Sequence, residues 1–190
     1  MINLEKLRKC IYNCKNAGDN LKDNSLFVSA AIMVIFSLDE IKLNQKLILI
    51  RRKNNLRKHA GQIAFPGGRF EIYDKSLIKT ALRETKEEIN ISENNLEVLG
   101  SLPVFYTGTG YVVTPFIAVL KKGFDYKNLM IADQNEVEKI LIVRACDLLK
   151  PSKQIRIKAP EGSKMKMTWK VPYKNENIWG LTARVLVTIS

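Results

Sequence analysis

The sequence predicts an α/β fold, a sandwich in which a mixed sheet packs around one strong central helix. Two observations lead to this. Apolar stretches rich in β-branched residues recur along the chain between turn signals, as strands do. One segment, residues 75–90, instead carries apolar side chains at helical spacing. The chain has 190 residues and no linker, internal repeat or low-complexity segment, so we expect a single domain with a sizeable core.

The other elements follow from the same two patterns along the chain. Helices are expected at residues 2–16, 75–90, 145–150 and 179–189. Strands are expected at residues 27–38, 46–52, 95–106, 112–120, 136–143, 155–158 and 166–173, the last two as a hairpin. Asp74 is expected to cap the start of the central helix, because its carboxylate can accept hydrogen bonds from free N–H groups. The apolar face of that helix is expected to consist of Ile78, Leu82, Thr85 and Ile89.

Composition excludes several classes of protein. A hydrophobic fraction of 46% and a charged fraction of 26% are ordinary for a globular chain and exclude a disordered or multi-span membrane protein. The longest apolar run, residues 26–38, is shorter than the stretch of about 20 residues that a membrane-spanning helix needs. The N-terminus lacks the apolar core of a secretory signal. We therefore expect a cytoplasmic protein without membrane contact.

The net charge of +12 permits anionic ligands without identifying one. Aromatic residues make up only 8% of the chain and do not interleave with basic ones, so no nucleic-acid partner is expected. A basic nucleic-acid-binding protein nevertheless stays as the alternative from another class. His59 is the one histidine, and Cys10, Cys14 and Cys146 are expected to be reduced thiols. The chain therefore offers few ligands for a zinc site and only one histidine for a Ser/His/Asp triad.

Three glutamates in the central helix are the strongest candidates for chemistry. Glu84, Glu87 and Glu88 stand at i, i+3 and i+4, so they share one helix face, beside the apolar stripe. Like charges at these spacings repel each other, and a divalent cation relieves the repulsion. Carboxylate oxygens suit Mg²⁺ or Mn²⁺. The alternative is an ordinary solvated face of glutamates and lysines.

A glycine-rich turn precedes this helix. Residues 61–68 read GQIAFPGG, and the paired Gly67 and Gly68 permit close backbone approach and positive φ. A loop that turns beneath a diphosphate and a metal needs both properties. A turn of this kind alone is only a turn, whereas its combination with the arginine and glutamates of residues 83–88 is much more specific.

At these residues the chain resembles the Nudix hydrolases, whose motif reads G, five residues, E, seven residues, then REUXEEXGU with U apolar. Residues 83–91, RETKEEINI, match the second half. Thr85 stands where an apolar residue is usual, and Asn90 replaces the glycine, although asparagine can still end a helix. The first half departs more. One extra residue separates Gly68 from the arginine, and Lys75 stands where the glutamate is usual, with Asp74 and then Glu71 as the nearest carboxylates.

In these departures the chain resembles one group within that family, the coenzyme A (CoA) diphosphatases. Residues 52–68 resemble the signature of that group, which is filled by Arg52, Arg57, Gly61, Phe65, Pro66, Gly67 and Gly68, and later segments at 109–115, 135–137 and 179–183 also look like it. Ile50 and Lys53 depart from it. The resemblance implies a Nudix-type α/β/α sandwich over residues 25–190, preceded by an N-terminal helix and turn at 1–24.

The resemblance also implies roles for the glutamates. Glu84 and Glu88 would bind the metal directly, and Glu87 would act through water on the metal or as a general base. Arg83 would pair with Glu87 at i+4 and orient it. Asp74 would be a helix cap or an outer-shell residue, and Glu136 a second base or ligand or merely a solvent-facing side chain.

Further residues would contact substrate. Gly67 and Gly68 would let the diphosphate approach the backbone. Arg52 and Arg57 would bind phosphate, with Arg57 on the 3′-phosphate of CoA, unless they belong to a solvated strand end with Arg51 and Lys58. His59 is expected to be a substrate or structural contact. Two tyrosines, Tyr106 and Tyr111, would stack on adenine or pack.

The function expected is Mg²⁺- or Mn²⁺-dependent hydrolysis of the diphosphate bond of CoA or its thioesters, by a monomer or homodimer. The products would be 3′,5′-ADP and a phosphopantetheine compound. The first alternative is the same chemistry on ADP-ribose, NADH or a capped nucleotide.

Overall fold

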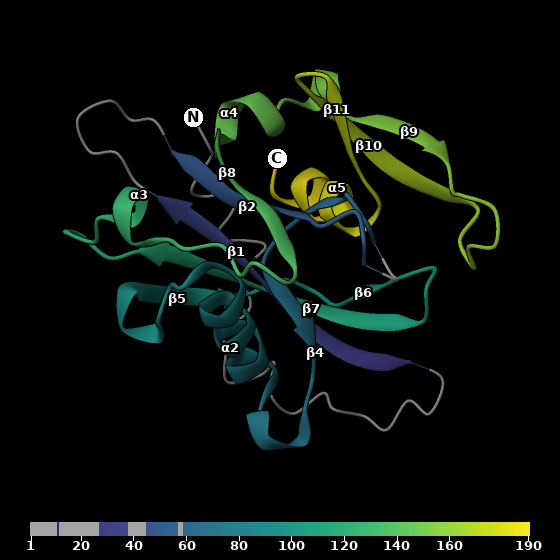
Figure 1. The fold of residues 1–190 in the computed structure, drawn as a ribbon. Helices are drawn as coiled ribbons and strands as arrows, with labels where there is room; N and C mark the ends of the chain where they lie inside the picture. Colours follow the sequence, from purple (N-terminus) through teal and green to yellow (C-terminus); the bar gives the residue numbers. More distant parts are fainter. Residues whose placement is uncertain (1–10, 12–26, 38–44, 57–58) are drawn as a thin grey trace.

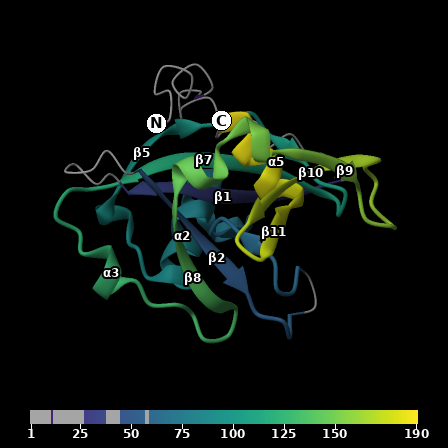
Figure 2. The same cartoon turned by 90° about the horizontal axis from the view of Figure 1, so that it is seen from above.

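The computed structural model describes residue 11 and residues 27–37, 45–56 and 59–190. Within this part a mixed eight-stranded sheet forms the centre of the molecule. Helix α2 (Leu77–Ile89) lies against one face of the sheet and helix α5 (Gly180–Ile189) against the other, as Figures 1 and 2 show. The predicted α/β sandwich with a mixed sheet is therefore confirmed.

The sheet is organised around its first strand. Its members are β1 (Val28–Ser37), β2 (Lys46–Arg52), β3 (Ile63–Ala64), β4 (Gly67–Arg69), β5 (Leu96–Ser101), β6 (Phe105–Tyr106), β7 (Tyr111–Leu120) and β8 (Val137–Arg144). Strand β1 runs parallel to β7 and antiparallel to β2 and β4. Because β7 occupies one edge of β1, strands β2 and β4 share the other edge, at residues 35–37 and 30–32. The chain between them passes through the turn of residues 61–68.

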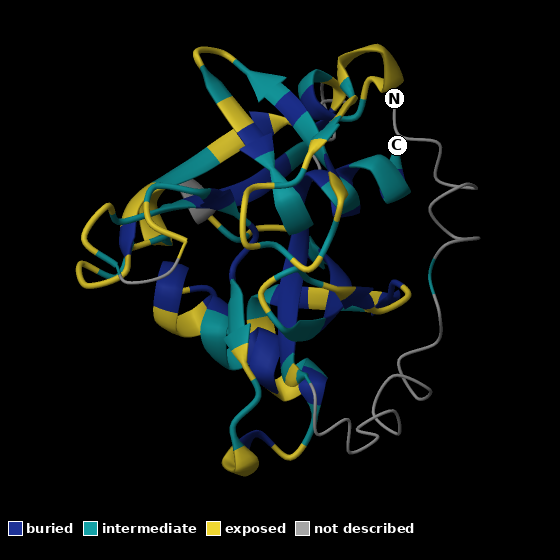
Figure 3. Cartoon of the chain, turned by 90° about the vertical axis from the view of Figure 1, so that its right-hand side faces the viewer, coloured by how far each residue is buried: buried dark blue, intermediate teal, exposed yellow. Residues whose placement is uncertain are grey.

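Side chains of β1 alternate between two cores, one on each face of the sheet. Ala31, Met33 and Ile35 belong to the core under α2. The intervening Ala30, Ile32, Val34 and Phe36 belong to the core under α5. Figure 3 shows buried residues where the elements pack together and exposed residues mainly on loops and outer edges. The apolar run that predicted β1 is thus a strand buried on both faces.

A second, three-stranded sheet packs beside α5. It consists of β9 (Ile155–Lys158), β10 (Met167–Tyr173) and β11 (Glu176–Trp179). The predicted hairpin of β9 and β10 is confirmed, whereas β11 is not predicted from the sequence. Short elements complete the described part: η2 (Ile72–Asp74), η3 (Glu93–Asn95), α3 (Tyr126–Leu129), α4 (Ala145–Leu148) and η4 (Pro151–Lys153).

The start of α2 differs from the prediction. Ser76 is the N-cap residue, so the prediction that Asp74 caps this helix is wrong. Asp74 lies in the preceding turn η2 with only 5% of its surface exposed. Its carboxylate is used by Arg83, as described below, and so it is not available to the N–H groups of α2. On the apolar face Leu82, Thr85 and Ile89 are buried as predicted, whereas Ile78 is only partly buried.

Some expectations fall outside the described residues. They are the helix at residues 2–16 apart from Ile11, the separate unit at residues 1–24, Cys10, Cys14, Arg57 and Lys58. Cys146 is a free, exposed thiol. Within the described part, no helix combines the length and apolarity that crossing a bilayer requires.

The end of α2 generates a stability prediction. Asn90 adopts a left-handed conformation with φ of 57°, and its N–H donates to the carbonyl of Lys86. A side chain with a Cβ and no polar group is strained there. Both variants lose the hydrogen bond from the Asn90 side chain to the carbonyl of Leu129, so we expect Asn90→Ala to be less stable than Asn90→Gly by about 1 kcal/mol, the cost of a Cβ in this conformation. Urea denaturation of both variants measures this, and equal stability of the two would contradict it.

Candidate active site

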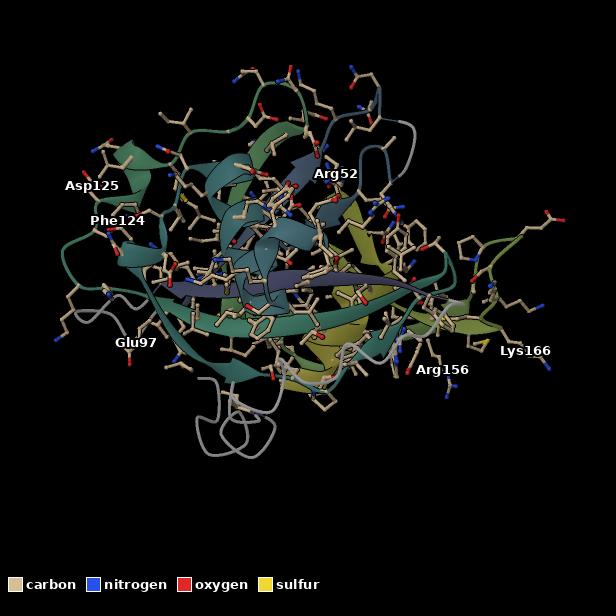
Figure 4. All side chains as sticks on the ribbon, turned by 90° about the horizontal axis from the view of Figure 1, so that it is seen from below. Arg52, Glu97, Phe124, Asp125, Arg156 and Lys166 are labelled. Atoms are coloured by element: carbon tan, nitrogen blue, oxygen red, sulfur yellow. The ribbon has the colours of Figure 1, made fainter. Side chains whose placement is uncertain are left out.

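The candidate active site forms where four segments meet: the end of β2, strand β4, helix α2 and the loop before β8. In Figure 4, Arg52 lies at this meeting point, well away from Arg156 and Lys166 of the β9–β10 hairpin. Gly67, whose N–H donates to Glu88, and Gly68, which lies beside Glu84, bring β4 against α2. The catalytic and metal-binding residues expected from the sequence are therefore brought together.

Glu88 is the most deeply buried of the three glutamates of α2, with 3% of its surface exposed. Its Oε2 accepts a hydrogen bond from the N–H of Gly67 at 2.9 Å, and its Oε1 accepts one from Arg52 at 3.1 Å. Burial raises the pKa of Glu88 to about 8 despite these two partners. The sequence places Glu88 beside the apolar stripe, whereas the structure puts it inside the protein.

Arg83 binds the other two glutamates. Its Nη1 donates to Glu84 at 2.8 Å and to Glu87 at 2.9 Å, so the predicted pairing with Glu87 at i+4 is confirmed. Burial raises the pKa of the Glu84 carboxyl, and the neighbouring Arg83 partly opposes that rise. Glu87 is exposed. One guanidinium thus holds two carboxylates of successive turns together.

Asp74 fixes Arg83 from the other side. Its two carboxylate oxygens accept hydrogen bonds from Nε and Nη2 of Arg83 at 2.7 and 3.1 Å. Thr80 and the N–H of Glu71 also donate to Asp74. The hydrogen bonds from Arg83 lower the pKa of Asp74 to about 2, so it remains ionised at neutral pH. Asp74 therefore lies behind the arginine, as an outer-shell residue would.

Arg52 bridges Glu88 to Glu136, which lies in the loop before β8. Its Nη1 donates to Glu88 at 3.1 Å and its Nη2 to Glu136 at 3.2 Å. The loop is held by Asp133, whose Oδ2 accepts from the N–H of Glu136, and by the N–H of Lys53, which donates to the carbonyl of Glu136. Arg52 is expected from the sequence to bind substrate, and in this structure it binds two site carboxylates instead.

The two glycines of β4 are required for different reasons. Gly67 has φ of 150°, and a Cβ there would collide with the backbone of Ala31 and Ile32 in β1. A Cβ on Gly68 would collide with the carboxylate of Glu84, and its φ lies outside the range that favours glycine. Close backbone approach is therefore a property of both glycines, while positive φ concerns Gly67 alone.

The sequence profile of the NUDIX domain matches residues 28–158, more than half of the chain. The chain belongs to the Nudix family. It is therefore a hydrolase that acts on pyrophosphate bonds. The Nudix-type α/β/α sandwich expected from the sequence is confirmed with it.

Curated relatives agree with this assignment. A protein named "Uncharacterized Nudix hydrolase NudL" from Photorhabdus laumondii is 35% identical over 166 residues, which are 87% of this chain and 84% of the relative. The protein of the same name from Yersinia enterocolitica is 34% identical over 143 residues, 74% and 70% of the two chains.

Solved structures share the fold. A MutT/nudix family protein from Enterococcus faecalis aligns with a TM-score of 0.54 at 18% identity, over 90% of this chain and 63% of its own. The Nudix hydrolase RenU from M. smegmatis aligns with a TM-score of 0.51 at 15% identity, over 63% and 72% of the two chains.

Nudix hydrolases generally use a divalent metal, and the residues at this site fit one. Among the described side chains no three His, Cys, Asp or Glu groups already form a cation cage. The oxygens that would bind a metal are instead held by Arg52, Arg83 and the N–H of Gly67. Carboxylate oxygens are nevertheless the ligands that hard divalent cations prefer, and a cation would offset the buried charge of Glu88.

Other residues considered in the sequence lie apart from this cluster or have other partners. Arg51 forms an ion pair with Glu176 of β11. His59 is exposed, has φ of 56° and lies 3.0 Å from the side-chain oxygen of Gln62. Tyr106 is exposed and packs edge-to-face on Phe27, whereas Tyr111 packs partly against the core under α5.

Sequence reasoning missed three partners: Thr80, Asp133 and Glu176. Thr80 has a local signal, since it is a polar residue next to the apolar face of α2 and three residues before Arg83. Asp133 has a weaker one, an Asx residue that binds the N–H groups two and three residues on. Glu176 has none, because its partner Arg51 is 125 residues away.

The glycines yield a prediction that separates folding from metal binding. Gly67→Ala is expected to lower the free energy of unfolding of the metal-free protein by about 2 kcal/mol or more, because its Cβ meets backbone that cannot move. Gly68→Ala is expected to keep most of that stability but to weaken Mn²⁺ binding at least tenfold, because its Cβ displaces Glu84. Urea denaturation and calorimetric titration measure the two effects. Full metal affinity in Gly68→Ala would contradict the placement of Glu84.

The pKa of Glu88 predicts how stability depends on pH. A carboxyl whose pKa rises from 4.5 unfolded to about 8 folded binds a proton more tightly in the folded protein. Its stabilising contribution is complete below pH 4.5 and is lost as pH rises through about 8. In EDTA, the stability of the wild type relative to Glu88→Gln should therefore fall between pH 5 and pH 8.5.

Glu84 shifts in the same direction and its charge contributes to the raised pKa of Glu88, so the difference reports Glu88 together with its coupling to Glu84. A difference that stays constant or grows with pH would contradict the buried position of this carboxyl. With saturating Mn²⁺ the trend should reverse, since a metal binds the ionised carboxylate.

Proposed function

We propose that this Nudix protein hydrolyses the diphosphate bond of CoA or its thioesters, giving 3′,5′-ADP and (acyl-)phosphopantetheine. One observation carries the proposal. Arg52 and Gly67, at opposite ends of the signature of residues 52–68, hold the two oxygens of the same carboxylate, Glu88. The segment that resembles CoA diphosphatases is thus built into the site rather than attached beside it.

Glu84, Glu87 and Glu88 are the residues that we propose hold Mg²⁺ or Mn²⁺. Their proximity supports this, since Arg83 joins Glu84 to Glu87, and the negative charge of Glu84 adds to the raised pKa of Glu88. When bound, a divalent cation would polarise the phosphoryl oxygens and lower the pKa of the attacking water.

The protein's own residues would bind the substrate and move the proton. Gly68 has no side chain, and the atoms nearest to its Cβ position belong to the Glu84 carboxylate, so the diphosphate could approach the backbone of β4 beside that carboxylate. Glu87 and Glu136 are both exposed, so the carboxylate of either can reach water and accept its proton as the new P–O bond forms and the bridging P–O bond breaks. Arg83 would keep Glu84 and Glu87 oriented throughout.

The 3′-phosphate distinguishes CoA from ADP-ribose and needs a cation. Arg51 and Arg52 already have carboxylate partners in this structure. Arg57 fills the second arginine position of the signature, and we propose it for this contact, although it lies outside the described residues.

Hydrolysis rates on CoA, dephospho-CoA, ADP-ribose and NADH, measured with Mg²⁺ and with Mn²⁺, test the substrate. CoA is expected to have the highest kcat/KM. Arg57→Ala should lower kcat/KM for CoA by about ten- to a hundredfold, the value of one charge-assisted contact, and barely change it for dephospho-CoA.

Glu84→Gln and Glu88→Gln are the inactive controls for the metal site, since an amide is a poorer ligand for these cations. Equal wild-type rates on all four substrates would refute the CoA assignment. Equal losses on CoA and dephospho-CoA would remove Arg57 from the 3′-phosphate. Near wild-type turnover in both glutamine variants would refute the metal site.

A further inference from the structure

Arg52 occupies an unusual position for a side chain expected to bind substrate. Its guanidinium joins carboxylates from two separate elements, Glu88 of α2 and Glu136 of the loop before β8. Glu88 is 3% exposed and Glu136 is 49% exposed, so Arg52 spans from the interior to the surface of the site. It is the cation that faces both of these carboxyl groups.

The backbone of Arg52 is fixed on both sides. Its N–H donates to the carbonyl of Gln62 at 3.0 Å, and its carbonyl accepts from the N–H of Gly61. The ladder between β2 and β8 shifts register between Arg51 and Arg52, which leaves Arg52 opposite Val137, next to Glu136. The base of the side chain is therefore held in place, and any movement of the guanidinium comes from its own rotatable bonds.

The pairing leaves donor capacity unused. Nε of Arg52 is buried and has no hydrogen-bond partner among the described residues. A guanidinium has five N–H donors in a planar fork, which suits phosphate oxygens as well as carboxylates.

A divalent metal and Arg52 would compete for the same oxygens. Oε2 of Glu88 already accepts from Gly67, and Oε1 is the oxygen that Arg52 binds. A cation that binds Oε1 would weaken this hydrogen bond and repel the guanidinium. Released from Glu88, the guanidinium would still lie at the site, where it could bind the anion that the metal also attracts.

We infer that Arg52 is an internal counter-cation that couples the two ligands: it holds Glu88 and Glu136 in the metal-free protein, and metal binding transfers it to the diphosphate of the substrate. This inference rests on the metal site proposed above but not on CoA as the substrate. Arg52 is thus a positioning residue before the metal binds and a substrate contact afterwards.

The proposal predicts changes of opposite sign in one variant. Arg52→Gln removes a cation that competes with the metal, so the metal-free protein should bind Mn²⁺ about five- to tenfold more tightly, a usual size for coupling between sites. Loss of Arg52 makes the site more negative and so favours both protonation of Glu88 and metal binding. The gain is larger for the metal, because a divalent ion carries twice the charge of a proton. In saturating Mg²⁺, the same variant should bind α,β-methylene-ADP about ten- to a hundredfold more weakly, since a charge-assisted contact is lost.

Calorimetric titration measures both affinities without turnover. Arg51→Gln is the matched control, because Arg51 is the adjacent residue, also has a carboxylate partner and has the same unpartnered buried Nε. It should change neither affinity. Arg52→Lys keeps the charge but lacks the planar fork, so both of its affinities should lie between those of wild type and Arg52→Gln. It also tests the proposal if the glutamine variant does not fold.

The outcomes separate the possibilities. Weaker binding of both Mn²⁺ and nucleotide in the Arg52 variants would mean that the residue only supports the structure, and would overturn the inference. Unchanged Mn²⁺ affinity would overturn it as well. If the wild type binds no Mn²⁺, the proposed metal site is wrong and the inference falls with it. Failure to cleave CoA, together with the predicted opposite shifts, would refute only the substrate.

Discussion

The site depends on one constraint, which is that the carboxyl group of Glu88 is buried at the C-terminal end of helix α2. Glu88 lies in the last turn of α2, where the helix dipole contributes partial negative charge, and only 3% of its surface is exposed. Neither the dipole nor the burial favours an ionised carboxylate. The groups around it, the N–H of Gly67 and the guanidinium of Arg52, are what the fold supplies in response. The N–H of Gly67 reaches Glu88 because β4 passes close to α2.

Two arginines, Arg52 and Arg83, bind the carboxyl groups of the site. Arg83 joins Glu84 and Glu87 within one helix, and Asp74 anchors it from behind. Arg52 joins Glu88 to a residue from a different part of the chain. Arg83 is hydrogen-bonded on both sides, by Asp74 and by the two glutamates. Arg52 differs because its buried Nε has no hydrogen-bond partner among the described residues.

The sequence predicts those helices and strands whose apolar residues repeat with a regular local period. Strand β1, helix α2 and the hairpin of β9 and β10 have patterns long enough to identify, and the pairing of Arg83 with Glu87 follows from helix geometry alone. Strands β3 and β4 have two and three residues, too few to show alternation, so they are not predicted. Most element boundaries lie within two residues of the predicted ones because caps such as Asn90 are local signals, but the strand expected at residues 95–106 is divided into β5 and β6.

The errors concern contacts between distant residues. Asp74 fits the preference for a helix cap, but an arginine nine residues later competes for its carboxylate and prevails. The burial of Glu88 depends on β4 crossing α2, which no spacing within the helix reveals. The bridge from Arg52 to Glu136 spans 84 residues, so the sequence identifies both side chains without indicating that they meet.

The shared edge of β1 has a consequence for how this protein can change by insertion or deletion. The odd-numbered residues of β1 face α2 and its even-numbered residues face α5, while one edge of β1 pairs with both β2 and β4. A single residue gained or lost within β1 would exchange the side chains of the two cores. It would also carry Gly68 away from its partner Ala31, and so away from Glu84. Substitutions can accumulate in this strand, but its length is fixed by three neighbours at once.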